Sequence, residues 1–307
     1  METVIGLDIG GSKSEVAVIE RGGRAAHLFR GPGGGLAADN ELAPLPELEK
    51  LLSGCSADAS YAIANLGGKN KKQISGILNR VWNDRVEVYR ESEGDVALNM
   101  AMIEGCSSIL LAGTGTILLI STDKGIRTIG GWGWEFGDEG SGYWIGRAAI
   151  AHLLRCIDLG FPLPIALPFR YPEFDRWKER LSFRDDIRAS LRALSRSEVA
   201  SLAAEVETLA AGKADWASRI LREAATQMAA IMAAGNSISG GAPIMINGGL
   251  SRSRCLMSFL KSLCMERNIP IIIKESASLA KVAAVMAARQ AGWREAGDKE
   301  WIKEICR

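Results

Sequence analysis

The chain has 307 residues, which is long enough for about two domains with sizeable cores. Its 37 Lys and Arg residues almost balance its 36 Asp and Glu residues, so no basic surplus is available to follow a nucleic-acid backbone or an anionic membrane. We therefore expect small-molecule partners, and neither nucleic acid nor a membrane.

The chain carries no sign of export. Met1 leads into an expected strand without a basic and apolar leader, and no apolar run approaches the roughly 18 residues that a spanning helix needs. We expect a cytoplasmic protein. The cysteines show no C-x-x-C pair and no histidine at zinc spacing, which predicts reduced, mostly buried thiols at Cys55, Cys106, Cys156, Cys255, Cys264 and Cys306.

The first half begins with "GLDIGGSKSEVAVI", residues 6–19, in which a glycine turn joins two expected strands. Strands are predicted at 4–7, 15–20 and 25–29, with a Gly-Gly hairpin between the last two, and together they form an antiparallel meander. An amphipathic segment at 45–52, a strand at 60–64, a helix at 71–81, a strand at 86–89 and a helix at 96–103 follow.

The second half repeats this order. "SILLAG", "TILLIST" and "IRTIGG", within residues 108–130, predict a second meander, again with a glycine turn after its first strand. Helical stretches at 143–159 and 174–234 follow, and the chain closes with strand "APIMIN", helix 253–267, strand "IPIIIK" and helix 277–291. Two tandem α/β halves fit poorly with a doubly wound dinucleotide fold, in which the first glycine turn opens a helix.

The glycine turns between strands are candidate phosphate loops, because a tight turn points several backbone N–H groups into one concavity and glycine lets a phosphate approach. In the first turn, Asp8 could hold Mg²⁺ beside phosphates that Ser12 or Lys13 contact. An ordinary hairpin is the alternative. The second turn, "AGTGT", adds the hydroxyl donors Thr114 and Thr116.

A third glycine turn lies in "IMINGGLSRSRCL", where Gly248 and Gly249 precede a helix expected to begin near Ser251 or Ser253. A helix N-terminus favours an anion or a nucleotide. A serine-capped loop explains the same residues, so this stretch leaves both accounts open.

The stretch "GGWGWEFGDEGSGYWIGRAAI", residues 130–150, predicts an ordered loop packed by aromatic rings, with carboxylates at a helix start. We expect Trp134 and Trp144 in the core. Asp138 is either a helix N-cap or a site carboxylate. Asp95, in "RESEGDVALNMA", follows a strand at the start of a helix, and it is either an N-cap or a general base.

In this order, "GLDIGGSKSEVAV", "LLAGTGT", "GGWGWEFGDEGSGYW" and "INGGL" resemble the N-acetylglucosamine kinase branch of the BadF/BadG/BcrA/BcrD ATPase family, within the actin-like sugar kinase superfamily. The resemblance implies an α/β protein with two ribonuclease H-like domains around a nucleotide cleft. These would be residues 1–106 and residues 107–291, the latter with a helical insertion at about 143–235, and a C-terminal helix at about 292–307 would pack on the first domain.

The resemblance also implies ATP and Mg²⁺ as cofactors, a sugar as the acceptor, and roles for particular residues. Asp8 falls where the family holds Mg²⁺, and Asp95 matches its catalytic carboxylate. The remaining positions match a first phosphate loop (Gly10, Gly11, Ser12, Lys13), a second phosphate loop (Thr114, Gly115, Thr116), a nucleotide-binding turn (Gly248, Gly249) and a sugar pocket (Gly131, Trp132, Asp138).

The chain departs from the family pattern at two places. Such kinases usually carry a Gly-Pro-x-Asn loop after the third strand, whereas this chain reads "GPGGG" at residues 31–35, with the nearest asparagine at Asn40. Near residue 65 it reads "NLGGK" in place of a small-residue and serine turn. The ATP half therefore matches better than the acceptor half, and the resemblance implies a kinase for an amino sugar such as N-acetylglucosamine or glucosamine.

Two other functions remain open. The first is an ATPase that activates an iron–sulfur dehydratase, with Cys106 and Cys156 as conceivable cluster ligands, and the second is a sugar sensor without catalysis. We expect a homodimer.

Overall fold

A computed structural model describes residues 2–9, 13–32, 59–66, 87–91, 93–165, 180–275 and 278–306, together with residues 50, 53, 80 and 81. The chain divides into two compact units. Unit 1 comprises Met1–Ile109, Leu119–Arg127 and Ser276–Arg307, and unit 2 comprises Leu110–Leu118 and Thr128–Glu275. The predicted domain boundary at residue 106 stays a prediction. The predicted segments at 45–52 and 71–81 lie outside the described residues, apart from residues 50, 80 and 81.

The first sheet has five strands in the order β3-β2-β1-β4-β5. Strands β1 and β2 and strands β2 and β3 pair antiparallel, whereas β4 is parallel to β1 and β5 is parallel to β4. The meander predicted for residues 4–29 is therefore confirmed. The strands are β1 (Thr3–Ile9), β2 (Lys13–Glu20), β3 (Ala26–Pro32), β4 (Ala59–Leu66) and β5 (Glu87–Glu91).

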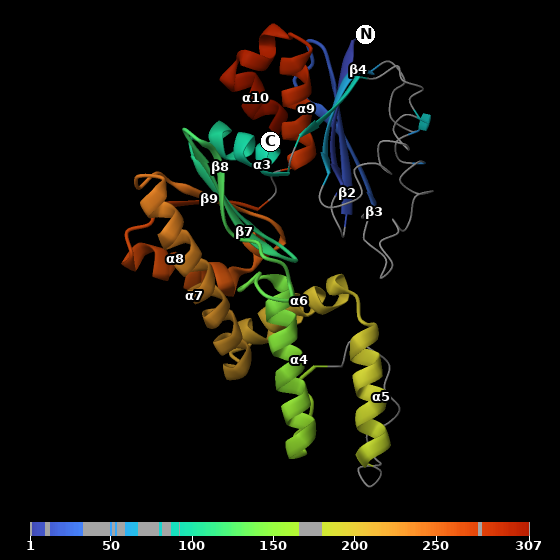
Figure 1. Cartoon of the computed structure of the whole chain (residues 1–307), viewed down its shortest axis with the longest axis vertical. Helices are drawn as coiled ribbons and strands as arrows, with labels where there is room; N and C mark the ends of the chain where they lie inside the picture. Colours follow the sequence, from blue (N-terminus) through green and yellow to red (C-terminus); the bar gives the residue numbers. More distant parts are fainter. Residues whose placement is uncertain are drawn as a thin grey trace. The chain divides into compact units, whose positions relative to one another are not determined.

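Helix α9 (Leu279–Gln290) packs directly on β1, β2 and β4 (Figure 1). The close approach depends on Gly6, because a Cβ atom there would lie 2.0 Å from the carbonyl oxygen of Ala280 and 2.2 Å from the amide nitrogen of Ala284. The helix presents small side chains to the sheet. The buried side chains of α9 pack in the core of unit 1 together with Val4, Ile5 and Leu7 of β1. Helix α3 (Glu93–Ile103) also contacts α9.

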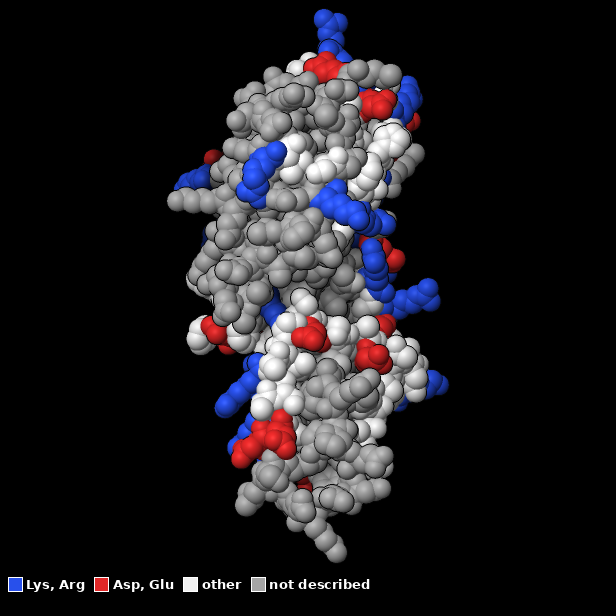
Figure 2. All heavy atoms as spheres, turned by 90° about the vertical axis from the view of Figure 1, so that its right-hand side faces the viewer, with Lys and Arg blue, Asp and Glu red and all other residues white. Residues whose placement is uncertain are grey.

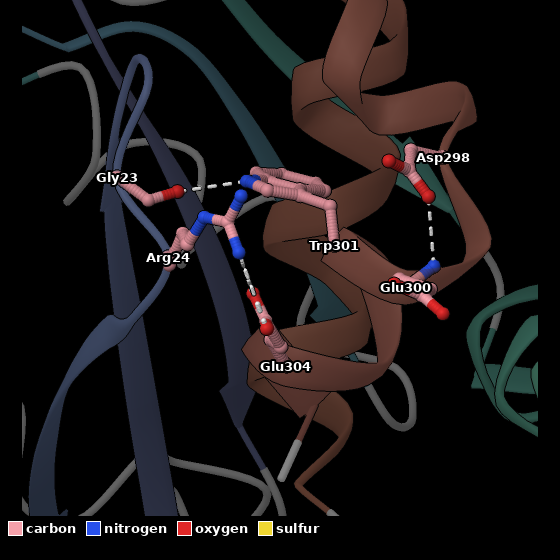
Figure 3. A network of polar contacts seen from close by, with 6 residues as sticks. All are labelled: Gly23, Arg24, Asp298, Glu300, Trp301 and Glu304. Atoms are coloured by element: carbon pink, nitrogen blue, oxygen red, sulfur yellow. Dashed lines mark hydrogen bonds and ion pairs between the residues drawn. The ribbon is translucent and has the colours of Figure 1, made fainter.

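The C-terminal helix α10 (Lys299–Cys306) is joined to the β2–β3 turn by the contacts in Figure 3. The Trp301 Nε1–H donates to the Gly23 carbonyl oxygen at 2.7 Å, and the indole is almost fully buried. The Asp298 carboxylate accepts a hydrogen bond from the Glu300 amide at 2.8 Å, which caps the first turn of α10. The ion pair between Arg24 and Glu304, at 3.4 Å, lies at the surface.

These contacts should differ in their contribution to stability. Replacing Trp301 by phenylalanine leaves the Gly23 carbonyl without its donor, so we expect the free energy of unfolding to fall by about 1 kcal/mol. Replacing Arg24 by glutamine is the control, because an exposed ion pair contributes less than about 0.5 kcal/mol. Urea unfolding curves measure both changes, and equal effects of the two substitutions would contradict the assignment.

The second sheet repeats the strand order of the first, as β10-β9-β6-β7-β8. Its meander is β6 (Ser108–Ala112), β7 (Thr116–Thr122) and β8 (Gly125–Gly130), and β9 (Ile244–Asn247) and β10 (Ile271–Lys274) follow in parallel. In both sheets the outer meander strand lies at one edge and the last strand at the other. The predicted duplication, with its two ribonuclease H-like sheets, is therefore confirmed.

The helical insertion of unit 2 consists of α4 (Gly142–Leu159), α5 (Arg180–Ala193), α6 (Arg196–Ala211) and α7 (Asp215–Ile238). The predicted helical tract at 174–234 is interrupted where Ser195 and Glu198 form a capping box at the start of α6. Helices α4 and α6 lie against each other at Gly146, where a Cβ atom would be 1.8 Å from the Val199 carbonyl oxygen. The backbones of α4 and α6 are therefore in direct contact at this point.

On the face shown in Figure 2, the described Lys and Arg side chains lie among Asp and Glu side chains, in line with the near balance of charge in the sequence. None of the helices that the structure describes has the length and apolar character needed to cross a membrane. The five described cysteines are free thiols, and three of them are buried (Cys106, Cys156 and Cys264).

Candidate active site

A short loop at residues 113–115 joins β6 to β7 in unit 2, and the N-terminus of α4 holds it in place. The amides of Gly142 and Tyr143, in the first turn of α4, donate to the carbonyl oxygens of Gly113 and Thr114 at 2.8 and 3.2 Å. The Ser141 hydroxyl accepts from the Trp144 amide at 3.1 Å. The first amides of α4 are thus bonded within the protein, so this helix end positions the loop and is not itself an anion site.

The arrangement leaves donor groups of the loop available. Within the described part of the chain, neither the Thr114 amide nor the Gly115 amide has a hydrogen-bond partner. The Thr116 hydroxyl is buried and likewise has no partner among the described residues. Successive amides in a tight turn are the donors that a phosphate group requires. These donors are compatible with the predicted second phosphate loop, whose role stays a prediction.

Asp138 lies directly beside this loop. Its side chain is only 6% exposed, and its Oδ2 atom lies 2.6 Å from Nη2 of Arg196, at the start of α6. A Cβ atom on Gly115 would be 2.8 Å from the same Asp138 oxygen and 2.7 Å from the Arg196 nitrogen. The structure thus brings a residue predicted for the sugar pocket against a residue predicted for the phosphate loop.

The backbone at Asp138 is unusual. Its φ angle is +56°, a left-handed conformation that few residues other than glycine, asparagine and aspartate adopt. The Asp138 carbonyl accepts from the Ser141 amide at 3.1 Å, which closes a turn before α4. Because Ser141 is the N-cap of α4, the N-cap account of Asp138 is wrong. The turn instead directs the carboxylate back toward the loop.

The aromatic loop, residues 131–137 before this turn, is mostly at the surface. Trp132 is 82% exposed and Phe136 is 86% exposed. The prediction that Trp134 lies in the core is wrong, since it is 43% exposed and packs edge-on against Tyr143 with ring centroids 5.3 Å apart. The chain doubles back through a hydrogen bond from the Gly137 amide to the Gly133 carbonyl at 2.8 Å, which leaves the intervening side chains outside.

Trp144, the other tryptophan predicted for the core, is partly buried in the first turn of α4. Gly131 precedes the exposed indole of Trp132 with φ +70°, and a Cβ atom at Gly131 would lie 2.6 Å from Cδ1 of Ile117 in β7. The start of the loop thus lies against the second sheet.

The third glycine turn lies against the end of β6, next to the predicted second phosphate loop. Gly248 has φ +116°, and a Cβ atom there would lie 2.3 Å from the carbonyl oxygen of Ala112, the residue just before the loop. The Ser251 hydroxyl donates to the Gly248 carbonyl at 2.7 Å, which begins the short helix η1 (Gly249–Arg252). The predicted nucleotide turn and the predicted second phosphate loop are therefore neighbours.

The helix after this turn, α8 (Arg254–Glu266), is not an anion site. The Glu207 carboxylate, from α6, accepts from the Ser253 hydroxyl and, at 2.7 Å, from the Cys255 amide. A protein carboxylate therefore caps the start of α8, and the nucleotide-binding role predicted for the preceding turn at Gly248 and Gly249 stays a prediction. The alternative of a serine cap is wrong, because the Ser253 side chain accepts no backbone hydrogen bond there.

Unit 1 contains the remaining predicted residues. Asp8 is half-buried near the end of β1 and lies opposite Glu15 of β2 in the strand register. Glu15 is 3% exposed, accepts from the Ser278 hydroxyl at 2.8 Å and pairs with Nε of Arg30 at 3.1 Å. Gly10, Gly11, Ser12 and the Lys13 side chain lie outside the described residues, as do most of the "GPGGG" and "NLGGK" segments.

Asp95 is the third residue of α3 and is half-buried. It lies inside the helix, so the N-cap account of this residue is wrong too. The first turn of a helix favours a carboxylate through the helix dipole. The Asn99 side chain donates to the Asp95 carbonyl oxygen at 3.0 Å, one turn along the helix.

The described residues contain no cluster of three or more His, Cys, Asp or Glu side chains that could hold a metal ion. Mg²⁺ usually binds through one or two carboxylates, with water and phosphate oxygens completing its shell. Asp8 offers one carboxylate of this kind near the end of β1, and the magnesium position stays a prediction.

Sequence reasoning missed three residues beside the predicted sites, one in unit 1 and two in unit 2. Glu15, opposite Asp8, could have been found by counting strand register across the first glycine turn. Arg196 lies in "SRSE", whose Ser195 and Glu198 form a recognisable capping box that places the arginine at a helix start. Glu207 left no local signal, because its partners lie 46 and 48 residues away.

Comparison with known proteins identifies the family of this chain. Residues 5–288 match the model of the BadF/BadG/BcrA/BcrD ATPase family. The chain belongs to the BadF/BadG/BcrA/BcrD ATPase family. It is 30% identical over 243 residues to an N-acetylmuramic acid/N-acetylglucosamine kinase of Clostridium acetobutylicum, which covers 74% of this chain and 77% of the relative.

Two solved structures share the fold of this family member. One is a protein of Chromobacterium violaceum assigned as an N-acetylglucosamine kinase, with a TM-score of 0.65, 21% identity, and coverage of 93% of this chain and 98% of the other. The second, from Porphyromonas gingivalis and assigned the same activity, has a TM-score of 0.67, 14% identity, and coverage of 95% and 100%. At these identities the likeness supports the fold alone.

Proposed function

We propose that this family member is an ATP-dependent sugar kinase whose acceptor is an amino sugar such as N-acetylglucosamine. The observation that carries the proposal is the contact between Asp138 and Gly115. A carboxylate suited to sugar hydroxyls lies against a glycine loop suited to phosphates, although the two are far apart in the sequence. The named activity of the relative from Clostridium acetobutylicum supports the same assignment.

The nucleotide half of the proposal rests on the amides of Thr114 and Gly115, which have no partner among the described residues, and on the adjacent Gly248 turn. ATP, when bound with Mg²⁺, supplies the phosphoryl group and the charge neutralisation that transfer requires. The protein then has to position the two substrates and provide a base near the acceptor hydroxyl. Asp8 is the residue that would hold Mg²⁺, with the Gly10–Lys13 turn as a further phosphate loop.

The acceptor half rests on Trp132 and Asp138. An exposed indole face packs well on the apolar face of a sugar ring, and a carboxylate accepts hydrogen bonds from its hydroxyl groups. Gly131 allows the chain to turn before the indole. Asp95 is the base that we propose accepts the proton of the attacking hydroxyl.

The acceptor range should be broad. The "GPGGG" segment offers no side-chain amide where related kinases carry an asparagine, and a missing polar contact relaxes discrimination strongly. The relative named for both N-acetylmuramic acid and N-acetylglucosamine is consistent with a roomy pocket. An ADP-release assay over hexoses, amino sugars and N-acetyl amino sugars tests this directly. ADP release that no sugar stimulates would refute the kinase assignment.

The same assay addresses the two other functions. A sensor would bind sugar without releasing ADP, and a dehydratase activator would hold an iron–sulfur cluster and be coloured. Cys106 and Cys156 are buried at 2% and 7% exposure, which does not suit a cluster shared between subunits. The cytoplasmic location and the homodimer stay predictions, and light scattering after size exclusion would measure the oligomeric state.

Replacing Trp132 by alanine should raise the KM for the acceptor by on the order of tenfold and change the KM for ATP little, because the indole is proposed to stack on the sugar alone. Phe136, which is as exposed and lies on the same loop, provides the matched control. Phe136→Ala should leave both constants near the wild-type values. Equal changes in the two constants for Trp132→Ala would contradict the assignment.

A further inference from the structure

We propose that Arg196 is a positioning residue for the second phosphate loop: it neutralises the buried carboxylate of Asp138 and thereby lets the Gly113–Gly115 loop accept nucleotide phosphates. The identity of the ligand rests on the proposed function, whereas the geometry is independent of it. Arg196 belongs to the helical insertion and lies 58 residues from Asp138 in the sequence.

The first step of the argument is the burial of Asp138. A carboxylate that is 6% exposed needs a cation or several donors, because removal of a charge from water is strongly unfavourable. The Arg196 guanidinium supplies this cation and donates to the Asp138 carboxylate at 2.6 Å. Loss of the arginine would leave an uncompensated negative charge beneath the loop.

The second step is the contact with the loop itself. Nη2 of Arg196 and Oδ2 of Asp138 are the two nearest atoms to the position of a Cβ on Gly115. No side chain separates the ion pair from the loop backbone at this point. An unpaired Asp138 would repel phosphate oxygens bound to the amides of Thr114 and Gly115, whereas the paired carboxylate is neutralised.

The third step is the place of Arg196 in its helix. It is the first residue of α6, directly after the N-cap Ser195, where the helix dipole disfavours a positive charge. Helix stability therefore does not explain an arginine here. The capping box fixes the start of α6 by hydrogen bonds between Ser195 and Glu198. Hydrogen bonding to the Ser195 side chain, and to a smaller extent to its backbone, lowers the pKa of Glu198.

The fourth step is the exposure of the guanidinium. The Arg196 side chain is 41% exposed, so it contacts the buried Asp138 and also remains accessible to solvent. A guanidinium has more N–H donors than this one ion pair uses. The loop region therefore carries no net negative charge and retains donors, which is the electrostatic condition for binding an anion.

The experiment measures the affinity for ADP with Mg²⁺ by isothermal titration calorimetry, together with the KM for the acceptor. Arg196→Gln should weaken ADP binding by about tenfold or more, with a smaller change in the acceptor KM. Arg196→Lys should recover part of the loss, because it restores the charge without the planar fork. Arg188→Gln is the matched control, since Arg188 forms an exposed ion pair with Asp185 in the same insertion.

A double variant tests whether Arg196 acts through Asp138. Asparagine tolerates the left-handed backbone at position 138, so Asp138→Asn removes the charge without strain. Adding Asp138→Asn to Arg196→Gln should return ADP affinity toward the wild-type value. Circular dichroism and thermal unfolding confirm that each variant is folded.

Two results would overturn the inference: wild-type ADP affinity in Arg196→Gln, or a double variant as weak as the single one. The proposed function can fail separately. If the wild-type protein binds ADP but no sugar stimulates ADP release, the kinase assignment is wrong and the Arg196 inference is still decided by the ADP affinities. If the wild-type protein binds no ADP, both are wrong.

Discussion

Replacing Asp95 by asparagine should lower kcat by on the order of a hundredfold while the affinities for ATP and sugar remain close to those of the wild-type protein. Asparagine keeps the size of the side chain and its place in the first turn of α3, but it cannot accept a proton. If Asp95 is the general base, the loss therefore falls on the chemical step and not on binding. Steady-state kinetics with both substrates varied, and calorimetry for ADP, separate the two.

Asp123→Asn is the control for this experiment, because Asp123 is an exposed acid in the turn between β7 and β8 of the same protein. It should retain full activity. Near-wild-type turnover by Asp95→Asn would move the role to another carboxylate, and Asp138 would be tested next. A rise in both KM values with unchanged kcat would show that Asp95 contributes to binding.

Replacing Gly248 by alanine should lower the free energy of unfolding by about 2–4 kcal/mol. Two effects add here. The φ angle of +116° with ψ 178° lies in a region that is essentially restricted to glycine. The new methyl group would also lie 2.3 Å from the Ala112 carbonyl oxygen, which cannot move without distorting β6. Thermal and urea unfolding measure the change.

Gly249→Ala separates stability from nucleotide binding in the same turn. A Cβ atom at Gly249 has open space around it, so this variant should unfold like the wild-type protein. If the turn contacts the nucleotide, both alanine variants should bind ADP more weakly, whereas only Gly248→Ala should be destabilised. Unchanged stability in Gly248→Ala would contradict the packing described for the turn.

The two meanders could be predicted within a few residues because they depend on local signals. Apolar strands and glycine turns follow one another directly in the chain, and each antiparallel pair is joined by a short loop. The duplicated order β3-β2-β1-β4-β5 and β8-β7-β6-β9-β10 could likewise be inferred from the repetition of these signals. The family motifs lie on the same turns, so they too could be read from the sequence.

The predicted helix caps were wrong because capping here depends on residues distant in the chain or on how a loop folds back. Asp138 and Ser253 precede helices and look like caps, yet Ser141 caps α4 and the Glu207 carboxylate occupies the start of α8. A local pattern shows which side chains could cap a helix. It does not show that a carboxylate 48 residues earlier in the chain arrives at the same amides. The exposure of Trp134 depends in the same way on how its loop folds back.

The sequence by itself determined the family, the α/β halves and the glycine turns, because these depend on residue types at short spacing. Only the tertiary structure decided what each glycine does. Gly6 and Gly146 allow a helix to lie directly on its neighbour, whereas Gly248 brings a turn against the end of β6. It also decided that Asp138 pairs with Arg196 beside Gly115. Such contacts join residues distant in the chain, and they form only when the packing of helices and sheets brings their backbones together.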